Sequence, residues 1–258
     1  MGRIIAITNQ KGGVGKTTTA VNLAAALAAA EKRVLLVDLD PQGNATTGCG
    51  INKRELQATA CDVLLGEAAA QDSIIGVQEG QFDLLPANAD LTAAEVRLLQ
   101  EIGREMRLKL ALESVRGLYD YVLIDCPPSI NTLTLNALTA ADGVLIPIQC
   151  EYYALEGLSA LLETIKQVRN TVNNSLSIEG LLRTMHDPRN RLATEVSTQL
   201  LKHFRDKVYD AIIPRNVRLA EAPSFGLSAI LHDKTSRGAQ AYVQLAAEVI
   251  RRGSTPEV

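Results

Sequence analysis

Residues 10–18 read Gln-Lys-Gly-Gly-Val-Gly-Lys-Thr-Thr, and this stretch decides the fold because of what lies on either side of it. The apolar run of residues 4–7 precedes it and a long Ala- and Leu-rich segment follows, so the order is strand, glycine loop, helix. A phosphate-binding loop requires that order. Its glycines let successive backbone N–H groups turn toward one anion, and the N-terminus of the helix adds a partial positive charge.

Two side chains of this loop carry the chemistry expected of it. Lys16 is positioned to lie along the β- and γ-phosphates of a nucleotide, and the Thr17 hydroxyl to ligate Mg²⁺. The general pattern asks for glycine at position 10, where this chain has Gln10, and a lysine, Lys11, stands at the front of the loop instead. A glycine turn that only caps a helix is the alternative. Eight specified residues in the required context weigh against it.

The composition favours one large α/β core. The chain has 258 residues, of which 47% are hydrophobic, 21% charged and only 3% aromatic. Abundant Ala, Leu, Val and Ile suit a parallel sheet with helices on both faces. The alternation of strand-like and helix-like segments predicts a doubly wound, mostly parallel sheet. We expect one P-loop domain over residues 1–252 and a frayed tail over 253–258.

Hydrophobic spacing and turn residues give a coarse element map. Helices are expected over residues 17–30, 91–115 with a break at Gly103, 131–141, 154–173 and 238–251. Strands are expected over residues 33–37, 82–85, 121–124, 143–148 and 178–185. Residues 43–60, rich in Gly, Thr and Asn, are expected to form a polar loop followed by a short helix. This segment is either a nucleotide-sensing switch or only a surface connection.

Charge and cysteine placement argue against several classes of protein. The formal net charge is −3, so there is no global electrostatic case for nucleic acid. The four cysteines (Cys49, Cys61, Cys126 and Cys150) form no Cys-x-x-Cys pair, which argues against disulfides and zinc and favours a reducing compartment. The chain holds no run of 18 apolar residues and enters its first strand directly. We therefore expect no membrane span, no signal peptide and a cytoplasmic location.

Three aspartates follow apolar strands. Residues 33–37 lead to Asp38 and Asp40, and residues 121–124 lead to Asp125. The carboxyl ends of parallel strands meet at one edge of a sheet, so we expect these carboxylates to share a crevice with the glycine loop. Asp125 has the position of a Walker-B aspartate, which holds Mg²⁺. For Asp40, which precedes a proline, simple initiation of a turn is the alternative.

Four motifs together resemble the ParA/MinD group of deviant Walker-A ATPases, and within it the chromosomal ParA/Soj partitioning proteins. They are K-G-G-V-G-K-T-T over residues 11–18, D-L-D-P-Q over 38–42, D-C-P-P-S over 125–129 and I-P-R-N-V-R-L over 213–219. The resemblance covers nearly the whole chain. It implies an ATP hydrolase that uses ATP and Mg²⁺, turns over slowly, and is stimulated by a ParB-type centromere-binding protein.

The resemblance also assigns roles to single residues. Lys11 of each subunit is expected to reach the phosphates held by the other subunit in an ATP-bound homodimer. Asp40 is expected to orient the attacking water and support the Mg²⁺ shell, while Asp38 is structural or supporting. The implied catalytic residues are Lys11, Lys16 and Asp40, and the implied metal residues are Thr17, Asp40 and Asp125. The implied nucleotide-binding residues are Lys11, Gly12, Gly13, Val14, Gly15, Lys16, Thr17 and Thr18, with Pro214 and Asn216 beside the adenine. Residues 149–153 are implied to form a switch or dimer-facing loop.

Positive charge gathers in the C-terminal half. Residues 183–218 hold eight Lys or Arg and four Asp or Glu. An ordinary solvated surface is the alternative interpretation. Proteins of the resembled family bind DNA without sequence preference through basic residues in this half. The chain shows no helix-turn-helix pattern, so contacts to the phosphate backbone and association with the nucleoid are expected. The implied DNA-binding residues are Arg189, Arg218, Arg215, Lys234 and Arg237.

Three other functions share part of this pattern. A membrane positioner of the MinD type needs a C-terminal helix with basic and bulky apolar faces, and residues 251–256 contain helix breakers instead. An iron–sulfur reductase or cluster carrier needs cysteines in a glycine-rich motif that can bridge two subunits, and none of the four is so placed. A binding module without catalysis would lack Lys16, Asp40 or Asp125, and all three are present. We expect no membrane partner.

Overall fold

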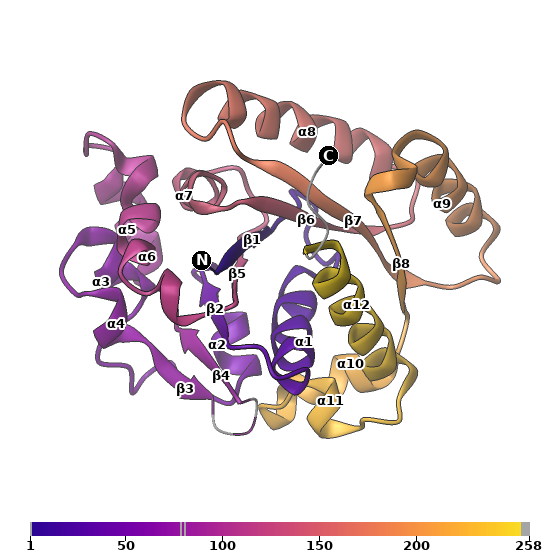
Figure 1. The fold of residues 1–258 in the computed structure, drawn as a ribbon, viewed down its shortest axis with the longest axis horizontal. Helices are drawn as coiled ribbons and strands as arrows, with labels where there is room; N and C mark the ends of the chain where they lie inside the picture. Colours follow the sequence, from indigo (N-terminus) through magenta and orange to yellow (C-terminus); the bar gives the residue numbers. More distant parts are fainter. Residues whose placement is uncertain (1, 78, 80, 254–258) are drawn as a thin grey trace.

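A computed structural model describes residues 2–77, 79 and 81–253. Its strands are β1 (Arg3–Ile7), β2 (Val34–Asp38), β3 (Ile75–Val77), β4 (Phe82–Leu85), β5 (Tyr121–Asp125), β6 (Gly143–Gln149), β7 (Ser177–His186) and β8 (Val208–Pro214). They form one sheet in the order β3-β4-β2-β5-β1-β6-β7-β8, in which only the β3–β4 pair is antiparallel. The predicted doubly wound, mostly parallel α/β fold is confirmed (Figure 1).

Helices cover both faces of the sheet (Figure 1). The α-helices are α1 (Lys16–Ala29), α2 (Asn44–Gly48), α3 (Ala60–Leu65), α4 (Ala70–Ser73), α5 (Leu91–Leu98), α6 (Arg107–Glu113), α7 (Thr132–Ala140), α8 (Ala154–Thr171), α9 (Arg191–Phe204), α10 (Val217–Glu221), α11 (Ala229–His232) and α12 (Arg237–Gly253). Short 3₁₀ turns are η1 (Arg104–Met106), η2 (Arg116–Leu118), η3 (Arg205–Lys207) and η4 (Ala222–Phe225).

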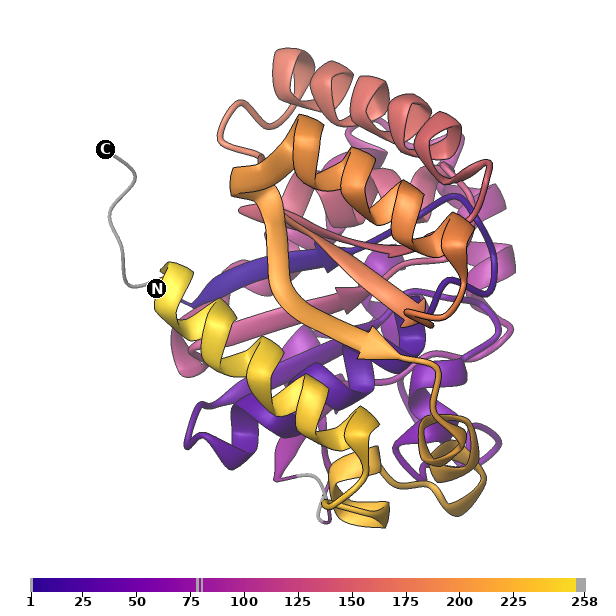
Figure 2. The same ribbon diagram turned by 90° about the vertical axis from the view of Figure 1, so that its right-hand side faces the viewer.

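The core lies in two layers, one on each face of the sheet. Side chains of a strand alternate between the faces, and β1 shows this directly. Ile4 and Ala6 pack into the layer that contains residues of α5 to α9, whereas Ile5 and Ile7 pack into the layer with α1 and α12. Figure 2 shows α12 beside β8 on one face and α8 and α9 on the other. In the sheet, β2 to β5 lie on one side of β1 and β6 to β8 on the other, so connections leave this region in both directions and a crevice opens at the carboxyl end of β1.

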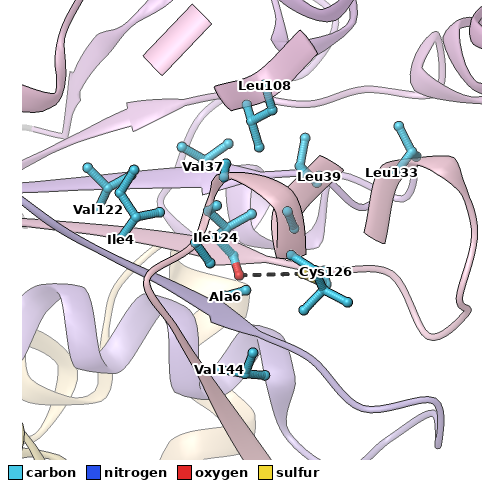
Figure 3. Close-up of a cluster of buried hydrophobic side chains, with 14 of the residues drawn as sticks. Ile4, Ala6, Val37, Leu39, Leu108, Val122, Ile124, Cys126, Leu133 and Val144 are labelled. Carbon is cyan, nitrogen blue, oxygen red and sulfur yellow. Dashed lines mark hydrogen bonds between the residues drawn. The ribbon is translucent and has the colours of Figure 1, made fainter. Parts of the chain in front are cut away.

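Cys126 belongs to the first of these layers. Its side chain is fully buried among Ile124, Leu133 and other apolar groups, and its Sγ lies 3.8 Å from the carbonyl oxygen of Ile124 (Figure 3). Burial raises the pKa of the thiol, so it stays protonated and unreactive at neutral pH. Cys126 is a packing residue.

One predicted break is confirmed and one segment differs from the element map. The helical stretch over residues 91–115 is divided at Gly103 as expected: α5 ends at Leu98 and α6 begins at Arg107, with Gly103 between them at a φ of +68°. The expected order of loop and helix in residues 43–60 is wrong, because α2 begins directly at Asn44. A buried hydrogen bond from the Thr46 N–H to Asp38 stabilises this helix, and composition alone does not reveal that contact.

The last helix runs further than its sequence suggests. α12 extends through Gly253, one residue into the stretch expected to fray, while residues 254–258 lie outside the described residues. Its apolar side chains Tyr242, Leu245 and Val249 are buried against the sheet. In the part of the chain that the structure describes, no helix combines the length and apolar character needed to cross a membrane.

Candidate functional site

The glycine loop connects β1 to α1 at the carboxyl edge of the sheet. Gly13 and Gly15 have φ values of 74° and 90°, in the left-handed region that side chains disfavour. This conformation lets α1 begin at Lys16. The Lys16 side chain is buried, and desolvation lowers the pKa of its amine while the nearby Asp125 carboxylate opposes that shift. A buried cation at a helix N-terminus is a setting suited to phosphate.

Polar contacts from the middle and the second half of the chain hold this loop. The Thr184 hydroxyl at the end of β7 donates to the carbonyl oxygen of Val14 at 2.8 Å. Asn9 donates to the carbonyl oxygen of Pro147 at 2.7 Å and accepts from the N–H of Lys11 at 3.0 Å. Sequence reasoning missed Thr184, because a threonine inside an apolar strand carries no local signal of a partner 170 residues away.

Lys11 stands at the rim of the loop. Its side chain is 39% exposed, and its ammonium forms an ion pair with Glu151, which follows β6. The loop over residues 149–153 therefore contacts the glycine loop within one subunit. Beside Glu151, the rings of Tyr152 and Tyr153 are largely exposed and pack edge to face at 5.0 Å.

Asp38 and Asp125 lie opposite each other where β2 pairs with β5. Asp38 is fully buried and accepts three hydrogen bonds: from the Thr46 N–H at 2.8 Å, the Thr46 hydroxyl at 2.7 Å and the Asp40 N–H at 3.1 Å. Burial nevertheless raises its pKa to about 6, against the lowering effect of these hydrogen bonds. Asp38 thus ties β2 to α2.

Asp125 has no such support. Both of its carboxylate oxygens are buried without a hydrogen bond of standard geometry to any described residue, although the Thr17 hydroxyl lies near enough to favour the charged form. Burial, followed by the charge of Asp38, raises the pKa of Asp125 well above its usual value. An unsatisfied buried carboxylate is costly, so a ligand that pairs with it, such as a divalent cation, would relieve the cost.

Asp40 is also largely buried, and its Oδ1 accepts from the N–H of Gln42 at 2.9 Å. This is the turn-forming contact expected of an aspartate before proline, and it leaves the other oxygen available. Among residues 2–77, 79 and 81–253, no three His, Cys, Asp or Glu side chains gather as a ready-made metal cage. Mg²⁺ does not need one, since it commonly takes one or two carboxylates together with phosphates and water. Thr17, Asp40 and Asp125 fit that donor set.

A small pocket of about 170 Å³ adjoins the loop on the side of β7 and β8. Its walls include Gly15, Met185, Pro214 and Asn216. Asn216 caps α10 by accepting from the Leu219 N–H at 3.3 Å, so its amide group remains for a ligand. Met185, with an unusual φ of +49°, is a further lining residue that sequence reasoning missed.

The five basic residues expected to contact DNA are all exposed. Arg189 follows β7 and pairs with Asp187 at 2.9 Å, which lowers the pKa of that carboxyl to about 2. Arg218 on α10 pairs with Glu221 at 2.9 Å and with Asp233 at 3.5 Å. Since β7 and β8 are neighbours, both arginines leave the same edge of the sheet as the glycine loop. The remaining three are Arg215, after β8, Lys234, in the turn between α11 and α12, and Arg237, the first residue of α12.

Comparison with known proteins identifies the family. A family model described as an AAA domain matches residues 2–178. The chain is 56% identical to the sporulation initiation inhibitor protein Soj of Bacillus subtilis, over 98% of this chain and 100% of that protein. It is 54% identical to the chromosome partitioning protein ParA of Caulobacter vibrioides, over 97% of this chain and 94% of that protein.

A solved structure agrees with this relationship. The cobyrinic acid a,c-diamide synthase of Mycobacterium smegmatis, with bound ADP and magnesium, superposes with a TM-score of 0.87 at 38% identity, over 100% of this chain and 97% of that one. The sheet order, the glycine loop and near full-length identity to two partitioning proteins lead to one conclusion. The chain belongs to the ParA/Soj family of chromosome-partitioning ATPases.

Proposed function

We propose that this protein is an ATP-dependent DNA-partitioning ATPase with slow intrinsic turnover, working in the cytoplasm at the nucleoid. Its ATP-bound homodimer binds DNA without sequence preference, and a ParB-type partner stimulates hydrolysis and releases it. One observation carries the nucleotide part of the proposal: Lys16 and the unsatisfied Asp125 are buried together beside a left-handed glycine loop. A bound Mg²⁺-triphosphate would offer a phosphate to Lys16 and a cation to Asp125, and so would pair both buried groups.

In the proposed site, residues 11–18 hold the phosphates through backbone N–H groups and Lys16, and Pro214 and Asn216 contact the adenine. Thr17, Asp40 and Asp125 face Mg²⁺, which when bound neutralises phosphate charge. Asp40 orients the attacking water with the carboxylate oxygen that Gln42 leaves unused. The structures of the M. smegmatis relative with ADP and with an ATP analogue, each with magnesium, support these cofactors.

The proposed dimer requires an exchange of partners at Lys11. Its ammonium pairs with Glu151 of the same subunit, so it must leave that carboxylate to reach phosphates across the interface. Both side chains are well exposed, and such pairs contribute only about 0–1 kcal/mol. Phosphates of a second subunit can therefore compete for Lys11, which would make hydrolysis depend on dimerisation.

DNA binding requires a similar exchange. Arg189 and Arg218 are exposed and held only by surface carboxylates. Surface pairs of this kind are weak and screened by salt. DNA phosphates could replace Asp187, Glu221 and Asp233 at small cost. Binding would release counterions condensed on the DNA, and because that release becomes less favourable at higher salt, the affinity should fall steeply as salt is added.

The decisive experiment measures binding to non-specific duplex DNA with ATP, ADP or no nucleotide across a salt series. The variants are Lys16→Ala and the double variant Arg189→Ala/Arg218→Ala. The matched control is Arg33→Ala/Arg97→Ala, which removes two exposed, ion-paired arginines elsewhere on the surface. Salt-sensitive binding only with ATP, lost in both test variants and retained in the control, would support the proposal.

A different result would redirect it. If the wild type hydrolyses ATP but binds no DNA with any nucleotide, the DNA-coating function is wrong. The protein would then be sought among relatives that position proteins or act at membranes. If the control loses as much affinity for DNA as Arg189→Ala/Arg218→Ala, the affinity depends on the net charge of the protein, and Arg189 and Arg218 do not form a specific DNA-binding surface.

A further inference from the structure

Two glycines from distant parts of the chain touch backbone to backbone. Gly50 follows α2, and Gly226 ends η4; their φ values are 79° and 67°. A Cβ atom on Gly226 would lie 2.5 Å from the Cα of Gly50, and one on Gly50 would lie 3.0 Å from the carbonyl oxygen of Gly226. Gly226 has no room for a side chain and Gly50 has very little, so no side chain separates the two segments.

On one side, this contact leads to the carboxyl end of β2. α2 starts two residues after the D-L-D-P-Q motif, and the N–H of Gly43 donates to the carbonyl oxygen of Asp40 at 2.8 Å. Thr46, in the middle of α2, is bound to the buried Asp38 through both its N–H and its hydroxyl. A shift of β2's end on nucleotide binding would therefore move α2 with it.

On the other side, the contact leads to Arg218. η4 continues directly from α10, and the Ser224 hydroxyl donates to the carbonyl oxygen of Glu221 at 2.7 Å. Glu221 is the nearer of the two carboxylates that pair with Arg218, the other being Asp233. Beyond η4, the N–H of Ala229 donates to Asn22 on α1 at 2.7 Å, so α1 fixes the far end of the segment.

We propose that the Gly50–Gly226 contact couples α2 to α10, so that the nucleotide state at residues 38–42 sets the position of Arg218. This inference rests on the proposed function and adds its regulation. Coupling between two sites requires a shared element that both can bias. Here that element is a rigid contact between two short helical segments, each tied by hydrogen bonds to one of the sites.

The test uses Gly226→Ala and Gly50→Ala, with Gly103→Ala as the matched control. Gly103 has a φ of +68°, nearly that of Gly226, but a Cβ there would meet nothing within 4 Å. The control therefore carries the same backbone cost without the contact. Two quantities are measured with and without Mg²⁺-ATP: hydrogen–deuterium exchange of amides in residues 217–226, and affinity for non-specific DNA. ATP affinity and thermal melting are measured in parallel.

We expect ATP to change amide exchange in residues 217–226 of the wild type and Gly103→Ala. In Gly226→Ala that change should disappear, and the ATP-dependent gain in DNA affinity should fall by about tenfold or more, within the range typical of coupled sites. ATP affinity should stay within about threefold of wild type, because neither glycine belongs to the nucleotide site. Gly50→Ala needs a smaller adjustment at 3.0 Å and provides the test if Gly226→Ala does not fold.

Two outcomes would overturn the coupling. One is a wild-type exchange response in both folded glycine variants, and the other is no response to ATP in the wild type. A failure of the proposed function looks different: exchange in residues 217–226 would respond to ATP in the wild type, and would lose that response in Gly226→Ala, while no variant bound DNA.

Discussion

The carboxyl ends of β2 and β5 lie side by side, yet the aspartates at these two ends differ in their hydrogen bonding. Asp38 on β2 accepts three hydrogen bonds and holds α2. Asp125 on β5, directly opposite, is equally buried and has both oxygens unsatisfied by the described residues. The carboxylate at the end of β2 is fully used in hydrogen bonds within the fold, whereas the carboxylate at the end of β5 is not. The contacts therefore give Asp38 a structural role, whereas Asp125 is the carboxylate that we propose pairs with Mg²⁺.

The largest effect is expected from a change at the end of β5, where Asp125 lies. Asp125→Asn should lower kcat/KM for Mg²⁺-ATP roughly 1,000-fold, because the loss of a charge-stabilising group in a buried site costs about 4 kcal/mol of the barrier. The same variant should melt at a higher temperature than wild type without nucleotide at pH 8, since the buried charge is gone. Steady-state hydrolysis and calorimetry measure the two. A variant that loses both activity and stability would assign Asp125 to the fold.

The second prediction tests whether Asp40, just beyond the end of β2, acts in hydrolysis and not in ATP binding. Asp40→Ala should reduce kcat by about 100-fold, the scale of a group that positions or activates the nucleophile. ATP affinity should change by no more than about threefold, because in the proposed site residues 11–18 hold the phosphates. Isothermal titration and single-turnover hydrolysis separate the two quantities. A variant that no longer binds ATP would contradict this role for Asp40.

A third variant removes the hydrogen bonds at the end of β2. Asp38→Ala leaves the Thr46 N–H, the Thr46 hydroxyl and the Asp40 N–H without their acceptor. Unsatisfied buried donors cost about 1–3 kcal/mol each, and removal of a buried carboxylate offsets part of this. We expect a net loss of about 2 kcal/mol in the free energy of unfolding by urea. Asp38→Asn, which keeps an acceptor oxygen, serves as the control and should lose less.

The last prediction is a pH dependence of stability. Burial raises the pKa of Asp38 to about 6 and that of Asp125 well above the usual value. An acid whose pKa is higher in the folded state binds more protons there, so its charge destabilises the fold as pH rises. For Asp38 this loss falls between pH about 4 and 6, whereas for Asp125 it extends to higher pH.

Thermal melting of the wild type and of Asp125→Asn, without nucleotide and from pH 5.5 to 8.5, measures this pH dependence of stability. The stability advantage of Asp125→Asn over wild type should grow with pH, by at most about 1.4 kcal/mol per pH unit, the limit for one proton. Parallel curves for the two proteins would mean that Asp125 is no harder to ionise in the fold than in the unfolded chain.

The sequence could predict whatever depends on short patterns. The order of strand, glycine loop and helix in residues 4–30 predicts the phosphate loop, and an apolar run ending in aspartate predicts the position of Asp125. Local pattern could not distinguish Asp38 from Asp125, because each is an aspartate at the end of a buried strand. Their difference comes from Thr46, which reaches only one of them.

The contacts that sequence reasoning missed are long-range. Thr184 and Val14, Glu151 and Lys11, and Gly50 and Gly226 each join residues more than 100 positions apart. Such pairs follow from the packing of the whole sheet and leave no trace in spacing or composition. The early start of α2 was missed for a related reason, since its stability comes from Asp38 and not from helix propensity.

The bond between Thr184 and Val14 has a consequence for how this protein can be divided. The family model ends at residue 178 and so includes the glycine loop, but Thr184 lies beyond that boundary. A fragment cut there would keep every residue of the loop and lose the hydroxyl that fixes its carbonyl from the other side. The glycine loop is therefore not an independent unit, because its conformation depends on the part of β7 that lies beyond the residues matched by the family model.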